Sequence, residues 1–307
     1  MAAHLHIAAH GKLLLAGEYF VLDGATSLAI PTRFGQHFDI KVHASKTSQL
    51  HWQSYDFQEK IWFESMLAGK DFQSIHTTNV SFTSRLRQIL LACQELGTIF
   101  PQGNVTVQSH LDFPRDWGLG SSSTLIYAIS KWLTINPFEL LQKTFGGSGY
   151  DIACANSESA IFYLLNDGLP NWKPVLFNPP FRKKIGFVYL GHKKNSREGI
   201  QTYRQKGNPP KALIQEISFL AKALTHQETL EAFMQIIEKL EQRTGDWLDL
   251  TPVKYAQFDD FDGAIKSLGA WGGDFVLTVS PKGKAYMQEY FQAKGLHHYL
   301  TFEEMAL

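Results

Sequence analysis

The sequence has little cysteine and no long apolar run. Its 307 residues include two cysteines, Cys93 and Cys154, and both lie inside apolar segments. Two such thiols supply neither a disulfide framework nor a zinc-ligand spacing, and reduced cysteines are typical of cytoplasmic proteins. No window is long and apolar enough to cross a membrane, and the first residues lack the pattern of a secretory signal. We therefore expect a cytoplasmic protein without a membrane partner.

An excess of charge of either sign is also missing. Lys and Arg total 29 and Asp and Glu total 29, which gives a formal net charge of zero. Nucleic acids and anionic membranes usually select basic surfaces, so neither is expected as the main partner. The remaining composition is that of a soluble globular protein. A chain of this length predicts two lobes, and the sequence leaves monomer and homodimer equally open.

Hydrophobic periodicity predicts alternating strands and helices along the first part of the chain. Residues with a period of two or with turn signals at both ends are expected to be strands, and those with one apolar helical face are expected to be helices. The predicted strands are short pieces within 11–31, then 38–44, a hairpin over 50–65, and 104–113. The predicted helices are 84–96, one after Ser121, and 137–145, which Asn136 caps and Pro137 opens.

Two prolines in "NPPF", residues 178–181, predict a boundary between domains 1–178 and 179–307. After it the patterns alternate again, which favours an α+β class for the second domain. The expected order is a strand over 185–190, a basic loop over 191–206, helices over 211–224 and 227–243, a helix ending at Leu268, a strand over 275–280, a helix over 282–293, and a strand over 299–302.

The segment "DWGLGSSSTLIYAI", residues 116–129, joins a predicted strand to a predicted helix. Unpaired N–H groups and partial positive charge at a helix N-terminus suit a phosphate group. Gly118 and Gly120 allow the backbone to approach an anion closely, and the serines that follow add hydroxyls. An ordinary helix with a serine N-cap explains the same residues.

Three further weak signals accompany this loop. Asp151 follows a glycine turn in "FGGSGYDIACA", residues 145–155, where a turn-capping role is the simpler alternative. Glycines 269, 272 and 273 lie in "KSLGAWGGDFVLTVS", which a tight connection into a strand explains equally well, with Asp274 as its cap. Lys12 stands beside the first strand, and its alternative is an ordinary surface lysine.

Taken in order, these stretches resemble the GHMP kinases. "HGKLLLAGEY", "PRDWGLGSSSTL" and "LGAWGGDF" are similar to the three motifs of that superfamily, and the likeness extends over residues 10 to 280. The pattern is most like the mevalonate and phosphomevalonate kinases, and resembles a bacterial subgroup named for its GYDIA sequence. The resemblance implies a two-lobed α+β fold, with an N-terminal lobe like ribosomal protein S5 domain 2 and a C-terminal ferredoxin-like lobe.

The resemblance also implies ATP and Mg²⁺ as cofactors. The residues implied to bind the ATP phosphates are Gly118, Leu119, Gly120, Ser121, Ser122 and Ser123, and Ser122 is also implied to bind Mg²⁺. Asp151 would be the base or the orienting group for the acceptor oxygen, and Lys12 would lie beside it. Glu139 is a weaker candidate for a second Mg²⁺ ligand, and a solvent-facing residue in the first turn of a helix is the favoured alternative.

On the acceptor side, the resemblance implies contacts from the third glycine loop, at Gly269, Ala270, Gly272 and Gly273, and from the basic loop, at Ser196 and Arg197. Cationic side chains there would hold an acceptor carboxylate or phosphate, whereas a solvated basic loop is the common alternative. Glu18 would face the acceptor or pair with a nearby cation. Trp271 stands where the family usually has glycine.

The resemblance implies an ATP-dependent kinase that acts on a small molecule of the mevalonate pathway, either mevalonate or phosphomevalonate. Two alternatives stay open on the same fold. One is a lyase like mevalonate diphosphate decarboxylase, which consumes ATP. The other is a catalytically silent nucleotide-binding protein, since fold does not fix function.

Overall fold

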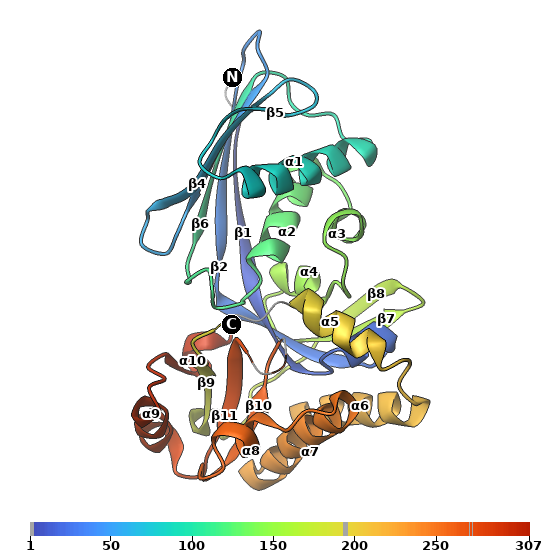
Figure 1. The fold of residues 1–307 in the computed structure, drawn as a ribbon, viewed down its shortest axis with the longest axis vertical. Coiled ribbons are helices and arrows are strands. Elements are labelled where there is room, and N and C mark those ends of the chain that lie inside the picture. The colour runs from blue at the N-terminus through green and yellow to red at the C-terminus, as the bar shows by residue number, and fades with distance from the viewer. Residues whose placement is uncertain (1–2, 193–195, 270, 272) are drawn as a thin grey trace. The chain divides into compact units, whose positions relative to one another are not determined.

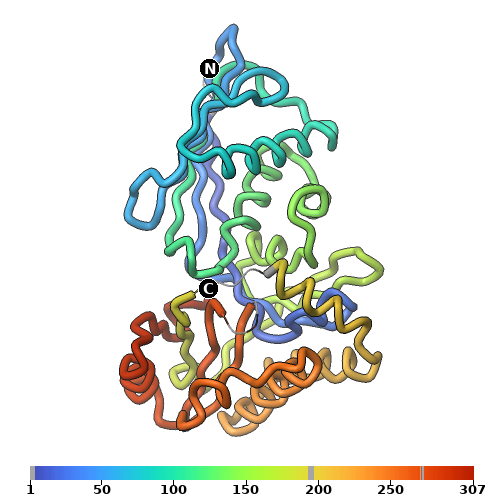
Figure 2. The backbone as a smooth tube through the Cα atoms, viewed as in Figure 1, coloured from blue at the N-terminus to red at the C-terminus, as the bar shows by residue number. Residues whose placement is uncertain are grey.

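The computed structural model describes residues 3–192, 196–269, 271 and 273–307. They form two compact units (Figure 2). The first unit comprises residues 1–11, 34–115 and 120–156, and the second comprises residues 12–33, 116–119 and 157–307. Strands β1 (Ala3–Ala16) and β2 (Ser27–His43) contribute residues to both. The division expected between residues 178 and 179 concerns the lobes of the family fold and stays a prediction.

The first unit is built on a mixed sheet. Its further strands are β3 (Gln49–Tyr55), β4 (Ile61–Ala68), β5 (Gln73–Thr77) and β6 (Asn104–Leu111), in the order β5-β4-β3-β6-β2. The β3–β6 pair is parallel and the other pairs in this order are antiparallel. The predicted hairpin over 50–65 is confirmed as β3 and β4. The strand pieces expected within 11–31 are parts of two longer strands, β1 and β2, and the strand expected at 38–44 is the end of β2.

Four helices cover one face of this sheet (Figure 1). They are α1 (Val80–Glu95), α2 (Ser121–Leu133), α3 (Pro137–Thr144) and α4 (Tyr150–Ala155). Apolar side chains that alternate along the strands meet the apolar stripes of α1 and α2 in one buried core, with Phe38, Trp52 and Val107 from the sheet and Ile89 and Ile126 from the helices. The predicted cap of α3 is confirmed, since the Asn136 side chain accepts a hydrogen bond from the Phe138 N–H at 3.0 Å.

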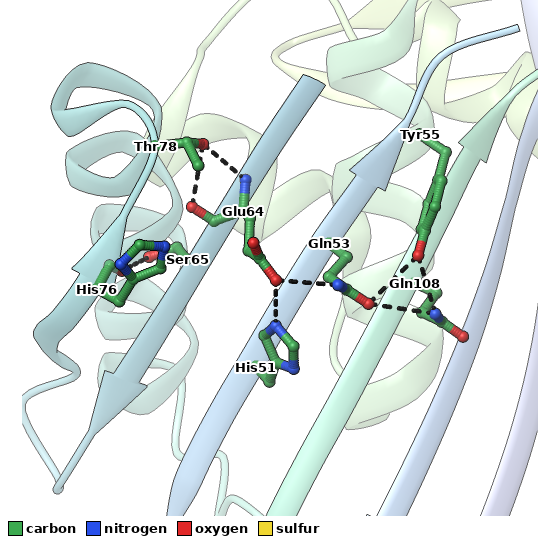
Figure 3. A network of polar contacts seen from close by, with 8 residues as sticks. All are labelled: His51, Gln53, Tyr55, Glu64, Ser65, His76, Thr78 and Gln108. Atoms are coloured by element: carbon green, nitrogen blue, oxygen red, sulfur yellow. Dashed lines mark hydrogen bonds and ion pairs between the residues drawn. The ribbon is translucent and has the colours of Figure 1, made fainter. Parts of the chain in front are cut away.

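The other face of the sheet is polar. Figure 3 shows part of it, where Glu64 of β4 accepts hydrogen bonds from Gln53 and His51 of β3. Further along the same sheet, His37 of β2 lies 3.1 Å from the Asp112 carboxylate. Imidazoles beside carboxylates hold a proton more tightly than in water, so the pKa of His37 is raised, chiefly by the hydrogen bond with Asp112.

The second unit contains an antiparallel sheet in the order β10-β11-β9-β12. These strands are β9 (Ile185–Tyr189), β10 (Ala264–Ser267), β11 (Phe275–Val279) and β12 (Tyr299–Thr301), and a hairpin of β7 (Ile161–Asn166) and β8 (Leu169–Pro174) pairs with the start of β2. The helices are α5 (Ser196–Gln205), α6 (Lys211–Ala223), α7 (Leu230–Leu248), α8 (Val253–Gln257), α9 (Gly283–Ala293) and α10 (Phe302–Met305). Three short 3₁₀ turns, η1 (Phe20–Asp23), η2 (Arg182–Lys184) and η3 (Leu224–His226), connect them.

Packing in the second unit corrects two expectations. The helix expected to end at Leu268 is strand β10, because α7 and α8 pack against it and β11 pairs with it. The stretch expected to be a basic loop contains helix α5, whose Tyr203 is fully buried. The predicted helices at 211–224, 227–243 and 282–293 are confirmed by α6, α7 and α9. None of the described helices combines the length and the apolar character needed to cross a bilayer.

Candidate functional site

Helix α2 begins at Ser121 without a side-chain cap. Its N-cap is Gly120, at φ 99°, which has no side chain to accept a hydrogen bond from the first turn. The serine N-cap considered from the sequence is therefore not formed. The Ser123 hydroxyl donates to the Gly120 carbonyl at 2.7 Å, whereas Ser122 is exposed. Amides at such a helix start carry partial positive charge and suit an anion.

The preceding residues of the same loop belong to the second unit. Gly118 has φ 69°, in the left-handed region that favours glycine. The Lys12 ammonium donates to the Gly118 carbonyl at 2.9 Å, and the Lys12 backbone N–H donates to the Leu119 carbonyl at 2.9 Å. Lys12 is thus bound to the loop through both its side chain and its backbone, which supports the view that it is more than a surface lysine.

The start of the loop is packed against the sheet of the second unit. The Tyr189 hydroxyl donates to the Asp116 carboxylate at 3.1 Å. The Trp117 ring meets the Phe275 ring edge to face, with centroids 5.5 Å apart. Burial and the neighbouring Asp116 raise the pKa of Tyr189. These contacts fix Asp116 and Trp117 within the second unit.

Asp274 lies directly against the loop. It is buried, has φ 54°, and its N–H donates to the His192 carbonyl at 2.9 Å. A Cβ atom added to Gly118 would lie 2.5 Å from the Asp274 Oδ2 atom, so no other residue fits at 118 without displacing the carboxylate. Asp274 therefore restricts the residue that the loop can carry at position 118.

The third glycine loop begins at Gly269, with φ 72°. Trp271 is buried, and its N–H donates to the Tyr19 hydroxyl at 3.1 Å. Gly273 is buried next to Asp274. Ala270 and Gly272, two of the predicted acceptor contacts, lie outside the described residues.

Asp151 is the second residue of α4, just after Gly149, which has φ 85°. One of its carboxylate oxygens, Oδ1, accepts a hydrogen bond from the Ile152 N–H at 3.0 Å. The Asp151 side chain is half-buried. It belongs to the first unit and Lys12 to the second, so the expected pairing of these two residues stays a prediction.

A buried ionic cluster lies behind the third loop. The Lys266 ammonium donates to the Glu18 carboxylate and to the Ser267 carbonyl, and both charged side chains are almost fully buried. Glu241 accepts hydrogen bonds from the Ser267 N–H at 3.0 Å and from its hydroxyl at 2.8 Å. Burial raises the pKa of Glu241 to about 7, although the positive charge of Lys266 acts to lower it. Of the two roles considered for Glu18, the cation pair is the one present.

The residues of the predicted basic loop, 191–206, differ in their surroundings. Arg197 is exposed on the first turn of α5. Arg204, on the last turn, pairs with Asp23 at 2.7 Å, which ties the helix to η1. Ser196 begins the helix, but its side chain lies outside the described residues, as do Lys193 and Lys194.

Three side chains of the first unit, of which Glu139 was a predicted Mg²⁺ ligand, are exposed or structural. Glu139 is exposed, and its carboxylate accepts a hydrogen bond from the Asn136 side chain at 3.2 Å. Trp52 is a core residue that donates to the Ser54 hydroxyl at 3.0 Å, and the Trp62 ring stacks under the Arg115 guanidinium at 3.6 Å. Among the described residues, no group of three or more His, Cys, Asp or Glu side chains has the arrangement of a metal site.

Sequence reasoning missed Tyr19, Glu241 and Lys266. Two of them left a local signal. Lys266 interrupts an apolar strand, and Glu241 falls on the apolar stripe of α7 between Leu240 and Thr244. A charge in such a place is expected to have a buried partner. Tyr19 left no signal, because its role depends on contacts with residues about 180 and 250 positions away.

No protein-family model matches the sequence, and no curated protein matches it. Solved structures match over nearly the whole chain. Mevalonate kinase from Methanococcus jannaschii is 16% identical, with a TM-score of 0.70 and 97% of each chain covered. Phosphomevalonate kinase from Streptococcus pneumoniae, in complex with phosphomevalonate and AMPPNP, is 17% identical, with a TM-score of 0.70, 97% of this chain covered and 100% of that one. The chain has the GHMP kinase fold.

This GHMP kinase fold is shared with sugar kinases as well. Galactokinase from Lactococcus lactis, in complex with galactose, is 12% identical, with a TM-score of 0.66, 99% of this chain covered and 93% of that one. The predicted α+β class is confirmed. Because proteins with different acceptors have the same fold, the fold leaves the acceptor open.

Proposed function

We propose that the protein is an ATP-dependent kinase that transfers the γ-phosphoryl group of ATP to mevalonate or phosphomevalonate. The observation that carries the proposal is the loop over residues 118–123. It combines glycines at positive φ, a helix start without a side-chain cap, an exposed serine, and a lysine bound to its backbone. Phosphoryl transfer requires chiefly such positioning and charge neutralisation.

The described residues fit ATP and Mg²⁺. The first-turn amides of α2 would hold phosphate oxygens, and the exposed Ser122 hydroxyl would be a Mg²⁺ ligand. Mg²⁺ supplies neutralisation of the phosphate charge when it is bound. Asp151 would accept the proton of the acceptor oxygen or orient that oxygen, since a carboxylate accepts hydrogen bonds when ionised.

The acceptor is proposed to carry a carboxylate or a phosphate. Arg197 is an exposed residue of α5, and a guanidinium binds either anion through two parallel hydrogen bonds. Structures that share the fold include phosphomevalonate kinase with phosphomevalonate and galactokinase with galactose. These names support a small acceptor with a hydroxyl or a phosphate. Arg197 predicts an acceptor with an anionic group, which favours an acceptor like phosphomevalonate over one like galactose.

A panel of acceptors tests this choice. ADP release would be measured with mevalonate, phosphomevalonate, homoserine and galactose, each against a reaction without acceptor. We expect release that depends on mevalonate or phosphomevalonate. Release with galactose alone would contradict the acceptor class and leave the kinase activity standing. Carbon dioxide as a product would indicate the lyase instead.

The variant Asp151→Asn tests the chemistry. It keeps the size of the side chain and removes the charge, so we expect turnover to fall at least about 100-fold. Stabilisation of the protein by Mg-ATP should stay unchanged, because that residue is not in the phosphate loop. Asp167→Asn is the matched control, since Asp167 is exposed in the β7–β8 turn with φ 50°, a conformation that asparagine adopts readily. Near-normal turnover by Asp151→Asn would refute the role of Asp151.

A further inference from the structure

Tyr19 has an unusual backbone conformation for a bulky residue. Its φ is 64° and its ψ is −47°, at the residue that precedes η1. Tyrosine rarely occurs at positive φ, and such strain persists only where the surroundings hold the residue in place. Glu18 before it is ion-paired with Lys266, and Phe20 after it is fully buried. The main chain is therefore fixed on both sides of Tyr19.

The Tyr19 side chain reaches two segments that are distant in sequence. Its hydroxyl oxygen accepts the hydrogen bond from the Trp271 N–H at 3.1 Å. Its ring stacks on the Tyr203 ring of α5, with centroids 5.5 Å apart and planes 18° from parallel. Burial raises the pKa of Tyr19, so the phenol stays neutral at physiological pH.

Helix α5 approaches the same hydroxyl through a glycine. A Cβ atom added to Gly199 would lie 2.5 Å from the Tyr19 hydroxyl oxygen, and 3.2 Å from the nearest ring carbons. Glycine is unfavourable inside a helix, so its presence here reflects this close approach. The hydroxyl of Tyr203 and the guanidinium of Arg204 also hold Asp23 of η1. Helix α5 is thus held by the segment from Tyr19 to Asp23.

We infer that Tyr19 is a positioning residue for the acceptor. Its hydroxyl holds the backbone of Trp271 and sets how closely α5 approaches through Gly199, so one side chain fixes both Trp271 and the helix that carries Arg197. The part of this inference that concerns the acceptor rests on the proposed kinase function. Tyr19 acts through Trp271 and Arg197.

Tyr19→Phe removes only the hydroxyl. We expect the Trp271 amide to exchange its hydrogen at least about threefold faster. The loss of one hydrogen bond favours local opening at that amide by about this factor, and exchange occurs from the open state. NMR of protein labelled with ¹⁵N-tryptophan measures this directly. The KM for the acceptor should rise about three- to tenfold, while the KM for ATP stays within about twofold. Tyr290→Phe is the matched control, since Tyr290 donates to Asp260 on the surface. An unchanged Trp271 exchange rate, or an equal rise in both KM values, would overturn the inference.

Gly199→Ala supplies a second test that needs no activity. In the natural protein the added methyl group meets the Tyr19 hydroxyl, so the melting temperature should fall by several degrees. In the Tyr19→Phe background that oxygen is gone, and the same substitution should lower the melting temperature by less than half as much. Equal losses in both backgrounds would show that Gly199 and Tyr19 are not in contact, and the inference would fail.

The two tests separate this inference from the proposed function. If the natural protein releases no ADP with any acceptor, the kinase proposal fails and the acceptor role of Tyr19 fails with it. The exchange rate of Trp271 and the Gly199 result still decide whether Tyr19 holds the loop and the helix together. If ADP release is normal and Tyr19→Phe leaves the acceptor KM unchanged, only the positioning role is refuted.

Discussion

Gly118→Ala is the substitution that most directly tests how the phosphate loop is built. Two separate effects act on the new methyl group. The backbone at 118 has φ 69°, where a residue with a Cβ loses about 1–2 kcal/mol relative to glycine. The Cβ would also lie 2.5 Å from the Asp274 Oδ2 atom and 2.6 Å from its Cγ atom. Forcing a group into a space this small costs about 1–3 kcal/mol.

Gly269→Ala separates these two effects. Its φ of 72° matches that of Gly118, but an added Cβ would meet the same Asp274 oxygen only at 3.3 Å. The expected loss of unfolding free energy is therefore about 1–2 kcal/mol at 269 and about 2–5 kcal/mol at 118. The difference between the two variants measures the clash with Asp274.

The assay is urea denaturation of both variants and of the natural protein, which gives the unfolding free energies. Adding Asp274→Gly to Gly118→Ala should recover most of the clash, because glycine tolerates the φ of 54° and has no carboxylate. The backbone contacts of residue 274 with His192 and Leu190 remain in that double variant. If Gly118→Ala and Gly269→Ala lose the same free energy, Asp274 does not pack rigidly on the loop, and the steric argument is refuted.

Three further predictions concern titratable groups. The pKa of Glu241 is raised to about 7 from an ordinary value of 4.5, so its contribution to stability should fall as pH rises from about 4.5 to about 7. Glu241→Gln should flatten this pH dependence of the melting temperature. An unchanged pH profile in the variant would contradict the prediction. The pKa of His37 is also raised, so the His37–Asp112 pair should stabilise the fold fully below about pH 6.5 and lose this effect as pH rises through the folded-state pKa. Asp112→Asn should remove this pH-dependent contribution to stability. A pH profile identical to that of the natural protein would rule the contribution out. Burial raises the pKa of the Cys93 thiol to about 12, so a thiol reagent should label Cys93 only in denaturant, which mass spectrometry detects; rapid labelling of the folded protein would count against this.

Local signals were sufficient for much of the fold and for the position of the phosphate loop. Apolar spacing predicted α1, α2 and α9, and the Asn136-Pro137 pair predicted the start of α3, because a helix start and a helical face depend on residues within a few positions. The glycines at 118 and 120 predicted a tight backbone, and both have positive φ. Expectations failed where packing outweighs local preference, as in β10, which is a strand because β11 pairs with it.

By itself, the sequence determined where the phosphate loop, Asp151 and the third glycine loop lie along the chain, and the family fold that their order resembles. Only the tertiary structure decided what surrounds them. It brings Asp274 against Gly118, pairs Glu18 with Lys266, and brings Tyr19 to both Trp271 and Gly199. The physical reason is the separation in sequence over which each kind of interaction acts. Periodicity and caps act within a few residues, whereas these contacts join positions more than 150 residues apart and exist only when whole faces of the fold meet.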